Sequence, residues 1–393
     1  MPNEALIVAA VRTPIGALGG VLSTVPATEL GATCIRELLQ RSGVAADELD
    51  EVIMGNVVSG GIGQNPARQC SIYAGVPASV GATTINKVCG SSLKAVMFAE
   101  QAIRLGDSHV VIAGGTESMS LAPYLLPQAR QGYRIGHGKL IDSMIQDGLW
   151  DAYGNAHMGT YGDQCAAEYS FSREEQDAFA IRSYLRARQA TSEGIFDDEI
   201  VTVSVPQRKG TKEVSDDEEP TRFNEDKLRE LRPAFSEQGT VTAGNASSVN
   251  DGAAALLVVS DSHCASLRLR PIARIVGSVT FSREPEWFTI APIGAIHKLV
   301  DKIGWSIDEV DLFEINEAFA NVAMAAARDL KVPEDKLNIY GGAVALGHPI
   351  GATGARILVT LLTGLSCTGG KRGIACLCIG GGEAVAMAVE RME

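Results

Sequence analysis

Short apolar runs alternate with amphipathic stretches along most of the chain, and this pattern predicts strands followed by helices. The run ALIVAAV (5–11) predicts a buried strand, and TELGATCIRELLQRSG (28–43) predicts a helix with Thr28 as its cap and Gly43 as its terminator. Further strands are expected at EVIMGNVVSG and HVVIAGG. Strands that alternate with helices predict a layered α/β protein with a parallel sheet.

The last third of the chain repeats this pattern. DEVDLFEI (308–315) echoes LDEVIMG (49–55), and GIACLCIGGGEA (373–384) echoes SHVVIAGGTES (108–118). A glycine-rich turn and helix, GATGARILVTLLTGL, stand where the helix after Cys89 stood. The repetition predicts an internal duplication into two similar α/β halves.

The region between the halves has a different composition, with aromatic residues, histidines and the acidic run VSDDEEPTRFNEDKLREL. Such a region is typical of an insertion that carries a binding surface. We therefore expect an N-terminal half at 1–118 plus 250–270, a loop domain at 119–249 and a C-terminal half at 271–393.

The composition limits the classes of partner. With 393 residues, of which 46% are hydrophobic and 21% charged, the chain has enough material for two or three cooperating domains. A net charge of −13 argues against binding to nucleic acid or to an anionic membrane. The opening segment lacks a secretory or transit pattern, so we expect a cytoplasmic protein whose eight cysteines are reduced.

Cys89 stands between an apolar run and a small-residue turn, in the stretch INKVCGSSLKA (85–95). The helix that follows ends at Gly106, so Cys89 lies at a helix N-terminus, where backbone N–H groups and the helix dipole favour a thiolate. Free cysteines are more often buried packing residues. Position alone leaves both interpretations open.

Two glycine-rich segments bear on that choice. His348 lies in GGAVALGHPIGATG (341–354), where Pro349 disfavours helical geometry and lets the histidine project into a cleft; a core histidine is the alternative. Cys378 precedes Gly380-Gly381-Gly382, whose backbone N–H groups could form an oxyanion hole. The duplication predicts that Cys89, His348 and Cys378 converge at the junction of the halves.

Other uses of these residues fit less well. The Cys376-x-Cys378 spacing lacks the usual gap of zinc ligands, and no fourth ligand has a recognisable spacing, so we expect no metal. A dinucleotide fingerprint is not matched either, because Pro66 stands where its third glycine should be.

Taken together, the motifs resemble those of the thiolases. INKVCGSSLKA, NEAFA (316–320), GGAVALGHPIGATG and CIGGGEA occur in the order and approximate spacing of that family, and GTVTAGNASSVNDGAA and His157-Met158-Gly159 match as well. The resemblance covers essentially the whole chain and is nearest to the short-chain branch, the acetyl-CoA acetyltransferases. It implies a five-layered α-β-α-β-α fold built from two duplicated halves with an inserted loop domain.

The resemblance also implies an activity and its catalytic residues. The implied reaction is a Claisen condensation of two acetyl-CoA molecules and its reversal by thiolysis; the alternative is a 3-ketoacyl-CoA thiolase of broader chain length. Cys89 would be the nucleophile and His348 its base, with Gly380 supplying an oxyanion donor. Cys378 would be the second base, and Asn316 would hold a water at the enolate, although the residues alone suggest that Asn316 is a helix N-cap.

Coenzyme A is the implied cosubstrate, with no further cofactor. The residues expected to contact it or its acyl group are His157, Met158, Arg222, Ala243, Ser247, Phe288, Ala318 and Phe319. Arg222 is assigned to the adenine end although the local match needs a gap, and an arginine in an acidic run is more often a surface ion pair. The bulk of Phe288 would favour short chains.

The chain departs from the family pattern at Ser92 and Ser248, where glycine is usual, and at Glu383, where methionine is common. A β-ketoacyl synthase is the nearest rival enzyme, but it resembles a Cys-His-His arrangement and here the third position is Cys378. A non-catalytic acyl-CoA-binding or redox-sensing protein would dispense with one member of the set. The family also suggests a homotetramer formed as a dimer of dimers.

Overall fold

The computed structural model describes residues 3–392, so the ends of the predicted domains at residues 1 and 393 lie outside the described residues. A single strand order, β14-β15-β16-β13-β1-β12-β5-β3-β4, runs through both halves of the chain. The strands of the N-terminal half are β1 (Ala5–Arg12), β2 (Gly16–Ala17), β3 (Glu51–Gly55), β4 (Gly81–Ile85), β5 (Val110–Ser118) and β12 (Asn250–Ser260). Those of the C-terminal half are β13 (Ala273–Ser282), β14 (Leu312–Ile315), β15 (Arg372–Ile379) and β16 (Glu383–Arg391).

The two halves repeat one pairing pattern. In the N-terminal half β3 and β5 are parallel, while β5–β12 and β12–β1 are antiparallel. In the C-terminal half β14 and β15 are parallel, while β15–β16 and β16–β13 are antiparallel. A short antiparallel pairing of β1 with β13 joins them. The expected parallel sheet is therefore wrong, because an apolar run predicts a buried strand but not its direction.

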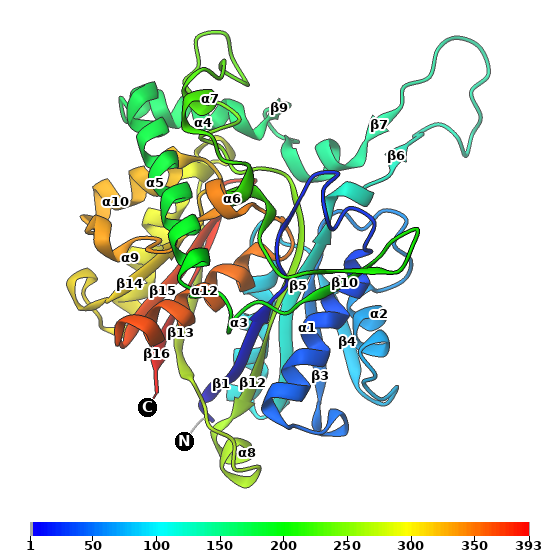
Figure 1. The fold of residues 1–393 in the computed structure, drawn as a ribbon, viewed down its shortest axis with the longest axis vertical. Helices are drawn as coiled ribbons and strands as arrows, with labels where there is room; N and C mark the ends of the chain where they lie inside the picture. The colour runs from blue at the N-terminus through cyan, green and yellow to red at the C-terminus, as the bar shows by residue number, and fades with distance from the viewer. Residues whose placement is uncertain (1–2, 393) are drawn as a thin grey trace.

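Helices form three layers around these strands. On the outside of the N-terminal half are α1 (Ala27–Ser42) and α2 (Pro66–Tyr73), and on the outside of the C-terminal half are α9 (Ala291–Ile303) and α10 (Ala320–Leu330). Between the two sets of strands lie α3 (Ser91–Leu105) and α12 (Thr353–Thr368). This arrangement confirms the expected α-β-α-β-α fold (Figure 1).

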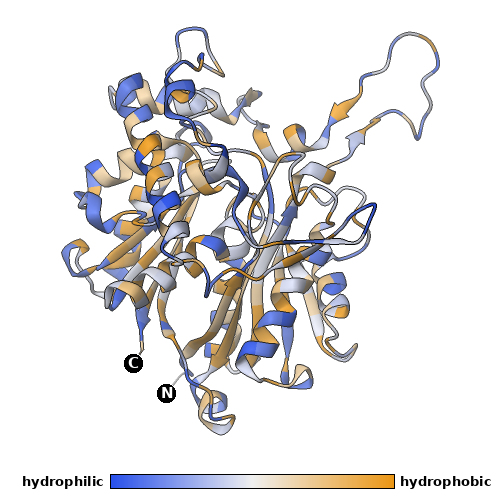
Figure 2. Ribbon diagram, viewed as in Figure 1, coloured by the Kyte–Doolittle hydropathy of each residue, from blue (hydrophilic) through white to orange (hydrophobic). Residues whose placement is uncertain are grey.

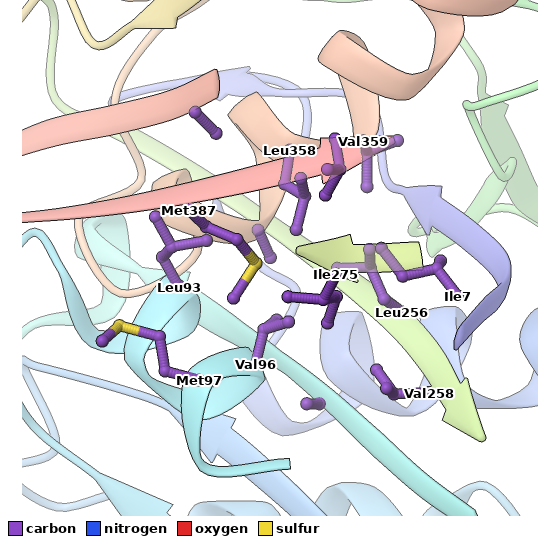
Figure 3. Close-up of a cluster of buried hydrophobic side chains, with 14 of the residues drawn as sticks. Ile7, Leu93, Val96, Met97, Leu256, Val258, Ile275, Leu358, Val359 and Met387 are labelled. Atoms are coloured by element: carbon purple, nitrogen blue, oxygen red, sulfur yellow. The ribbon is translucent and has the colours of Figure 1, made fainter. Parts of the chain in front are cut away.

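The central layer is the largest apolar core. Leu93 and Val96 of α3 and Leu358 of α12 pack against Leu256 of β12 and Met387 of β16, all fully buried (Figure 3). Hydrophobic residues are concentrated along these inner strands (Figure 2). Because side chains from both halves fill one core, the N-termini of α3 and α12 are held beside each other.

Helix ends follow the glycines but not every predicted cap. Gly43 and Gly106 end α1 and α3 with φ of 70° and 81°, the left-handed conformation that suits glycine. Thr28 does not cap α1, because Pro26 takes the N-cap position in an extended conformation and the helix already begins at Ala27.

The insertion at 119–249 leaves the sheet after β5 and returns to it at β12. Its strands and longer helices are β6 (Tyr124–Leu125), β7 (Ile141–Asp142), β8 (Trp150–Asp151), β9 (Ala156–His157), α4 (Met158–Glu168), α5 (Arg173–Ser192), β10 (Val203–Pro206), β11 (Thr211–Val214), α6 (Glu218–Arg222) and α7 (Glu225–Arg229). Residues 126–140, between β6 and β7, form an arm that extends away from the body (Figure 1). The fully buried guanidinium of Arg12 on β1 binds the carboxylates of Glu199 and Asp217, which anchors the insertion to the N-terminal half.

The remaining short helices connect these elements. They are η1 (Ala46–Glu48), η2 (Met119–Leu121), η3 (Met144–Leu149), α8 (Asp261–Ser266), η4 (Pro285–Ile290), η5 (Ile307–Glu309), η6 (Glu334–Lys336) and α11 (Ala343–Leu346). Within residues 3–392, none of the helices is both long and apolar enough to cross a membrane.

Candidate active site

Cys89 lies in the turn that leads into α3, directly against the C-terminal half. A Cβ atom added to Gly90 would lie 2.3 Å from Cδ1 of Ile379 on β15, so glycine permits this close approach. The preceding residue, Val88, has a φ of 47°, which a β-branched residue rarely adopts. The turn is thus a tightly specified element at the junction of the halves.

The backbone N–H groups of Gly380 and of Cys89 itself lie beside the sulfur of Cys89, where they lower the pKa of its thiol. They come from different halves of the chain and stabilise negative charge at this point. Burial acts in the opposite direction and is the larger effect, so the pKa of the Cys89 thiol rises to about 11. This pKa does not support the expectation that the helix N-terminus favours a thiolate, because a thiol with a pKa of about 11 stays protonated at neutral pH.

His348 faces the same pocket from the loop between α11 and α12. Its Nδ1 lies 2.6 Å from Oγ1 of Thr353, and the Thr353 hydroxyl also lies 2.9 Å from the carbonyl oxygen of Pro349. A hydroxyl has one proton, so when Thr353 donates to Pro349 it accepts the Nδ1–H of His348. This arrangement leaves Nε2 with a free lone pair, and Nε2 has no partner among the described residues.

The charge state of His348 suits a base. Burial, followed by the positive charge of Arg356, lowers the pKa of His348 to about 3. The imidazole is therefore neutral throughout the physiological pH range and able to accept a proton.

Two buried side chains fix the His348 loop in place. Oδ1 of Asn250 accepts the backbone N–H of His348 at 2.8 Å. Oε2 of Glu117, at the end of β5, accepts the N–H groups of Gly351 at 2.9 Å and Val57 at 3.0 Å. Asn250 and Glu117 belong to the N-terminal half, so the base is held by the half that supplies the nucleophile.

Cys378 is fully buried near the end of β15. Burial, and then the negative charge that Cys89 would carry, raise the pKa of the Cys378 thiol well above its usual range. Cys378 packs in one apolar cluster with Met158, Phe288 and Phe319. It therefore lies immediately behind the pocket wall next to Cys89.

Asn316 follows β14 and is also buried, at 1% exposure. Helix α10 begins at Ala320 with Phe319 at its N-cap, so the predicted N-cap role of Asn316 is wrong. The side-chain amide is instead free: neither Nδ2 nor Oδ1 has a hydrogen-bond partner in the described part of the chain. A buried amide in this state can bind a small polar group.

A cavity of about 340 Å³ lies between Cys89 and His348. Cys89, His348 and Gly380 line it, together with the expected residues His157, Met158, Ala243, Ser247, Phe288, Ala318 and Phe319. Cys378 and Asn316 stand outside this lining. Segments that are distant in sequence therefore form one largely apolar pocket that contains a thiol and an imidazole.

Several of the expected pocket residues have defined partners. His157 caps α4 by accepting the N–H of Gly159, and its ring stacks on Phe235 with centroids 4.8 Å apart. The backbone N–H and the hydroxyl of Ser247 both donate to the carbonyl oxygen of Ala318 at 3.0 Å. The oxygen of Ser247 therefore remains available only as an acceptor.

Arg222 is not brought to the pocket. It ends the short helix α6, where its exposed guanidinium pairs with Glu218 one turn earlier. This is the surface ion pair that its acidic surroundings favoured.

Sequence reasoning did not place every residue of the pocket. The cavity is also lined by Met119, Gly148, Leu149, Ala234, Phe235, Ala246, Ser248, Val249 and Ile350. Thr353 had a local signal, since a hydroxyl residue lies five positions after His348 in the same glycine-rich loop. Phe235 and Glu117 had none, because only the fold brings them to the site. Among residues 3–392, no group of three or more His, Cys, Asp or Glu side chains could hold a metal ion.

Comparisons with known proteins agree over the whole chain. Residues 5–262 match the family model "Thiolase, N-terminal domain", and residues 269–391 match "Thiolase, C-terminal domain". An acetyl-CoA acetyltransferase of Chromobacterium violaceum is 52% identical over 99% of this chain and 100% of the relative, and one of Pseudomonas aeruginosa is 50% identical with the same coverage.

Solved structures give the same result. The crystal structure of the Bacillus anthracis acetyl-CoA acetyltransferase superposes with a TM-score of 0.97 at 42% identity, covering 100% of this chain and 99% of that one. A thiolase from Ascaris suum in complex with coenzyme A gives a TM-score of 0.94 at 41% identity, covering 99% and 100%.

Proposed function

The chain belongs to the thiolase family and is an acyltransferase, and we propose how its residues transfer an acetyl group between two acetyl-CoA molecules. The activity is that of an acetyl-CoA acetyltransferase: condensation gives acetoacetyl-CoA and CoA, and thiolysis reverses it. One observation supports the proposed roles above all others. Cys89, Gly380 and His348 line one pocket, the backbone N–H groups of Cys89 and Gly380 lie beside the Cys89 sulfur, and Nε2 of His348 has no partner among the described residues.

In the first half-reaction, Nε2 of His348 takes the proton of the Cys89 thiol as the sulfur attacks the thioester carbonyl of acetyl-CoA. The carbonyl oxygen becomes an oxyanion, which the N–H groups of Cys89 and Gly380 stabilise. A single donor of this kind is worth about 2.7–4 kcal/mol in other acyl-transfer enzymes. The intermediate collapses, the C–S bond to CoA breaks, and the imidazolium protonates the departing CoA thiolate.

In the second half-reaction, the Cys378 thiol passes its proton to Nε2 of His348, and the resulting thiolate removes a proton from the methyl group of a second acetyl-CoA. The enolate oxygen is stabilised by the Nε2–H of the His348 imidazolium and by a water that the free amide of Asn316 holds. The enolate carbon then attacks the acetyl group on Cys89. Cleavage of the Cys89 thioester then releases acetoacetyl-CoA, and the imidazolium of His348 returns its proton to the Cys89 thiolate.

The pocket supports a short acyl group and the pantetheine arm of coenzyme A. Phe288 is 3% exposed and meets Tyr161 edge to face, with centroids 6.3 Å apart, so it closes one side of the acyl end. The oxygen of Ser247 can accept an amide N–H of pantetheine, because its own proton is already donated to Ala318. No cofactor other than coenzyme A is needed for these steps.

We also propose an oligomeric state and a cellular location for the protein. A homotetramer, formed as a dimer of dimers, is supported by the arm at 126–140, on which Ile135 is 100% and Leu140 63% exposed. Apolar side chains on a projecting segment fit contact with another copy of the chain. A cytoplasmic location is supported by the eight free cysteines. Sedimentation of wild type beside a chain with a shortened arm tests the assembly.

A thiolysis assay across 3-ketoacyl-CoA lengths tests the activity. We expect kcat/KM to be highest with acetoacetyl-CoA and to fall with each added pair of methylenes, and Cys89→Ser to abolish turnover. Equal turnover of long-chain substrates would favour a thiolase of broader chain length instead. A wild-type protein without activity on acetoacetyl-CoA would contradict the proposal.

A further inference from the structure

An ion pair joins the two catalytic turns on the outside of the pocket. Lys87 lies two residues before Cys89, and Glu383 lies three residues after Gly380. Nζ of Lys87 contacts Oε2 of Glu383, and the two side chains are 20% and 30% exposed. The pair therefore links the N-terminal half to the C-terminal half at the point where each places one backbone N–H group beside the Cys89 sulfur.

The turn on the N-terminal side is strained and needs restraint. Val88, between Lys87 and Cys89, has a φ of 47°. Its N–H donates to Oδ1 of Asn86 at 2.8 Å, and the N–H of Lys87 donates to Oγ of Ser91 at 2.8 Å. These bonds fix the shape of the turn, but they lie within it and do not fix its distance from Gly380. A strained conformation persists only where its surroundings over-determine it.

The partner on the C-terminal side is well anchored. Glu383 begins β16 and pairs with both Ile379 and Ser282 across the sheet. Its Oε1 accepts the hydroxyl of Ser282 at 3.1 Å, which leaves Oε2 for Lys87. Gly382, next to it, has a φ of 84°, and a Cβ atom there would lie 2.3 Å from the carbonyl oxygen of Arg283. The glycine turn is therefore held in place by the sheet, and the contact with Glu383 lets Lys87 keep the Cys89 turn at a set distance from it.

We propose that Lys87 and Glu383 are a positioning pair that sets the separation of the Cys89 and Gly380 N–H groups for the oxyanion of acyl transfer. This inference rests on the proposed acetyl transfer through Cys89. Neither side chain lines the pocket, so the pair acts through the two donors rather than on the substrate. Small displacements matter here, because a misplacement of about 1 Å can cost about 10²-fold in rate.

A double-mutant cycle tests the pair in the full-length protein. Lys87→Met and Glu383→Gln each remove one charge and keep the approximate length of the side chain. We expect each to slow acetylation of Cys89 by acetyl-CoA about tenfold, with KM changed less than about twofold, because the donors act mainly in the transition state. The double variant should be no slower than either single variant, since the second change then removes nothing further.

Two further variants separate positioning from general stability. Exchange of the charges, Lys87→Glu with Glu383→Lys, should recover most of the wild-type acetylation rate. Glu309→Gln is the matched control: it breaks the ion pair with Arg372, whose side chain is 30% exposed, at the opposite end of β15. This control should acetylate at the wild-type rate. Rates are expressed per acetylatable Cys89, so that loss of folded protein is not counted as loss of rate.

The outcomes distinguish this inference from the proposed function. Wild-type rates in both single variants, multiplicative effects in the double variant, or effects confined to KM would each overturn the positioning role while leaving acetyl transfer intact. If the wild-type protein itself is not acetylated on Cys89, the proposed function fails first and the pair with it.

Discussion

The protonation states of Cys89 and His348 can be tested most directly. Burial disfavours the charged form of both side chains, so Cys89 differs from a nucleophile that is already a thiolate at rest. The pKa of Cys89 is raised to about 11 and that of His348 is lowered to about 3. With about 1.36 kcal/mol per pKa unit, ionising Cys89 alone at neutral pH costs roughly 5 kcal/mol. An ordinary cysteine with a pKa of about 8.5 would need only about 2 kcal/mol.

The same magnitudes decide whether Cys89 and His348 form an ion pair at rest. Transfer of the proton from sulfur to imidazole crosses a gap of about eight pKa units, or roughly 11 kcal/mol. Attraction between adjacent opposite charges offsets about 4 kcal/mol of this at an effective dielectric of about 20. We therefore expect a neutral thiol beside a neutral imidazole, with the proton moving only as the substrate is attacked.

Ultraviolet absorbance of the thiolate measures this state. We expect the difference spectrum between wild type and Cys89→Ser to lack a thiolate band at neutral pH and to gain it only as the pH approaches about 11. The rate of Cys89 acetylation should meanwhile be nearly flat around neutral pH, because neither group titrates there. A thiolate band at neutral pH that disappears in both Cys89→Ser and His348→Asn would refute the neutral pair.

Three substitutions test the other proposed roles. Cys378→Ala should leave acetylation of Cys89 within about threefold of wild type but lower condensation by at least about 10²-fold, as loss of a general base does; near-normal condensation would contradict its role. Thr353→Val removes the acceptor of the His348 Nδ1–H and should slow acetylation about tenfold, whereas Thr353→Ser should retain the rate; equal rates in the two variants would exclude a role in setting the tautomer. Phe288→Ala should raise kcat/KM for longer 3-ketoacyl-CoA substrates relative to acetoacetyl-CoA by about tenfold, measured by thiolysis, and an unchanged preference would place the length filter elsewhere.

Apolar periodicity and glycine positions are local signals, and they predicted strands, helices and a layered α/β protein, whereas the five layers were implied by the resemblance to the thiolases. Gly43 and Gly106 end their helices as expected, since both adopt the left-handed conformation. Strand direction was not predictable in this way. β12 follows a long insertion and β16 returns from a tight glycine turn, and each runs antiparallel to its neighbours. The direction of a strand depends on the segments that connect it to its neighbours, and the apolar pattern carries no information about the path of those segments.

The same distinction between local signals and long-range contacts applies to the active site. Cys89, His348 and Gly380 lie in short motifs, and the structure brings all three to one cavity. The pKa of Cys89 could not be read from its motif, because it is a balance between two N–H donors, one from a distant segment, and desolvation by the whole fold. Arg222 is absent from this cavity and pairs with Glu218 on the surface, and its assignment to the adenine end of coenzyme A stays a prediction.

The raised pKa of Cys89 is compatible with its role as nucleophile, because in the proposed mechanism His348 removes the thiol proton only as the sulfur attacks the substrate. We propose that the N–H groups of Cys89 and Gly380 stabilise the carbonyl oxygen once it becomes negative, and burial that opposes a resting thiolate also strengthens their attraction for that oxyanion. Each half of the duplicated chain supplies one donor, and His348 is held by Asn250 and Glu117 of the other half. Acetyl transfer is therefore a property of the junction. Neither half alone contains a nucleophile, its base and a complete pair of donors, so the contacts that set the distance between the halves determine the rate as directly as the catalytic groups do.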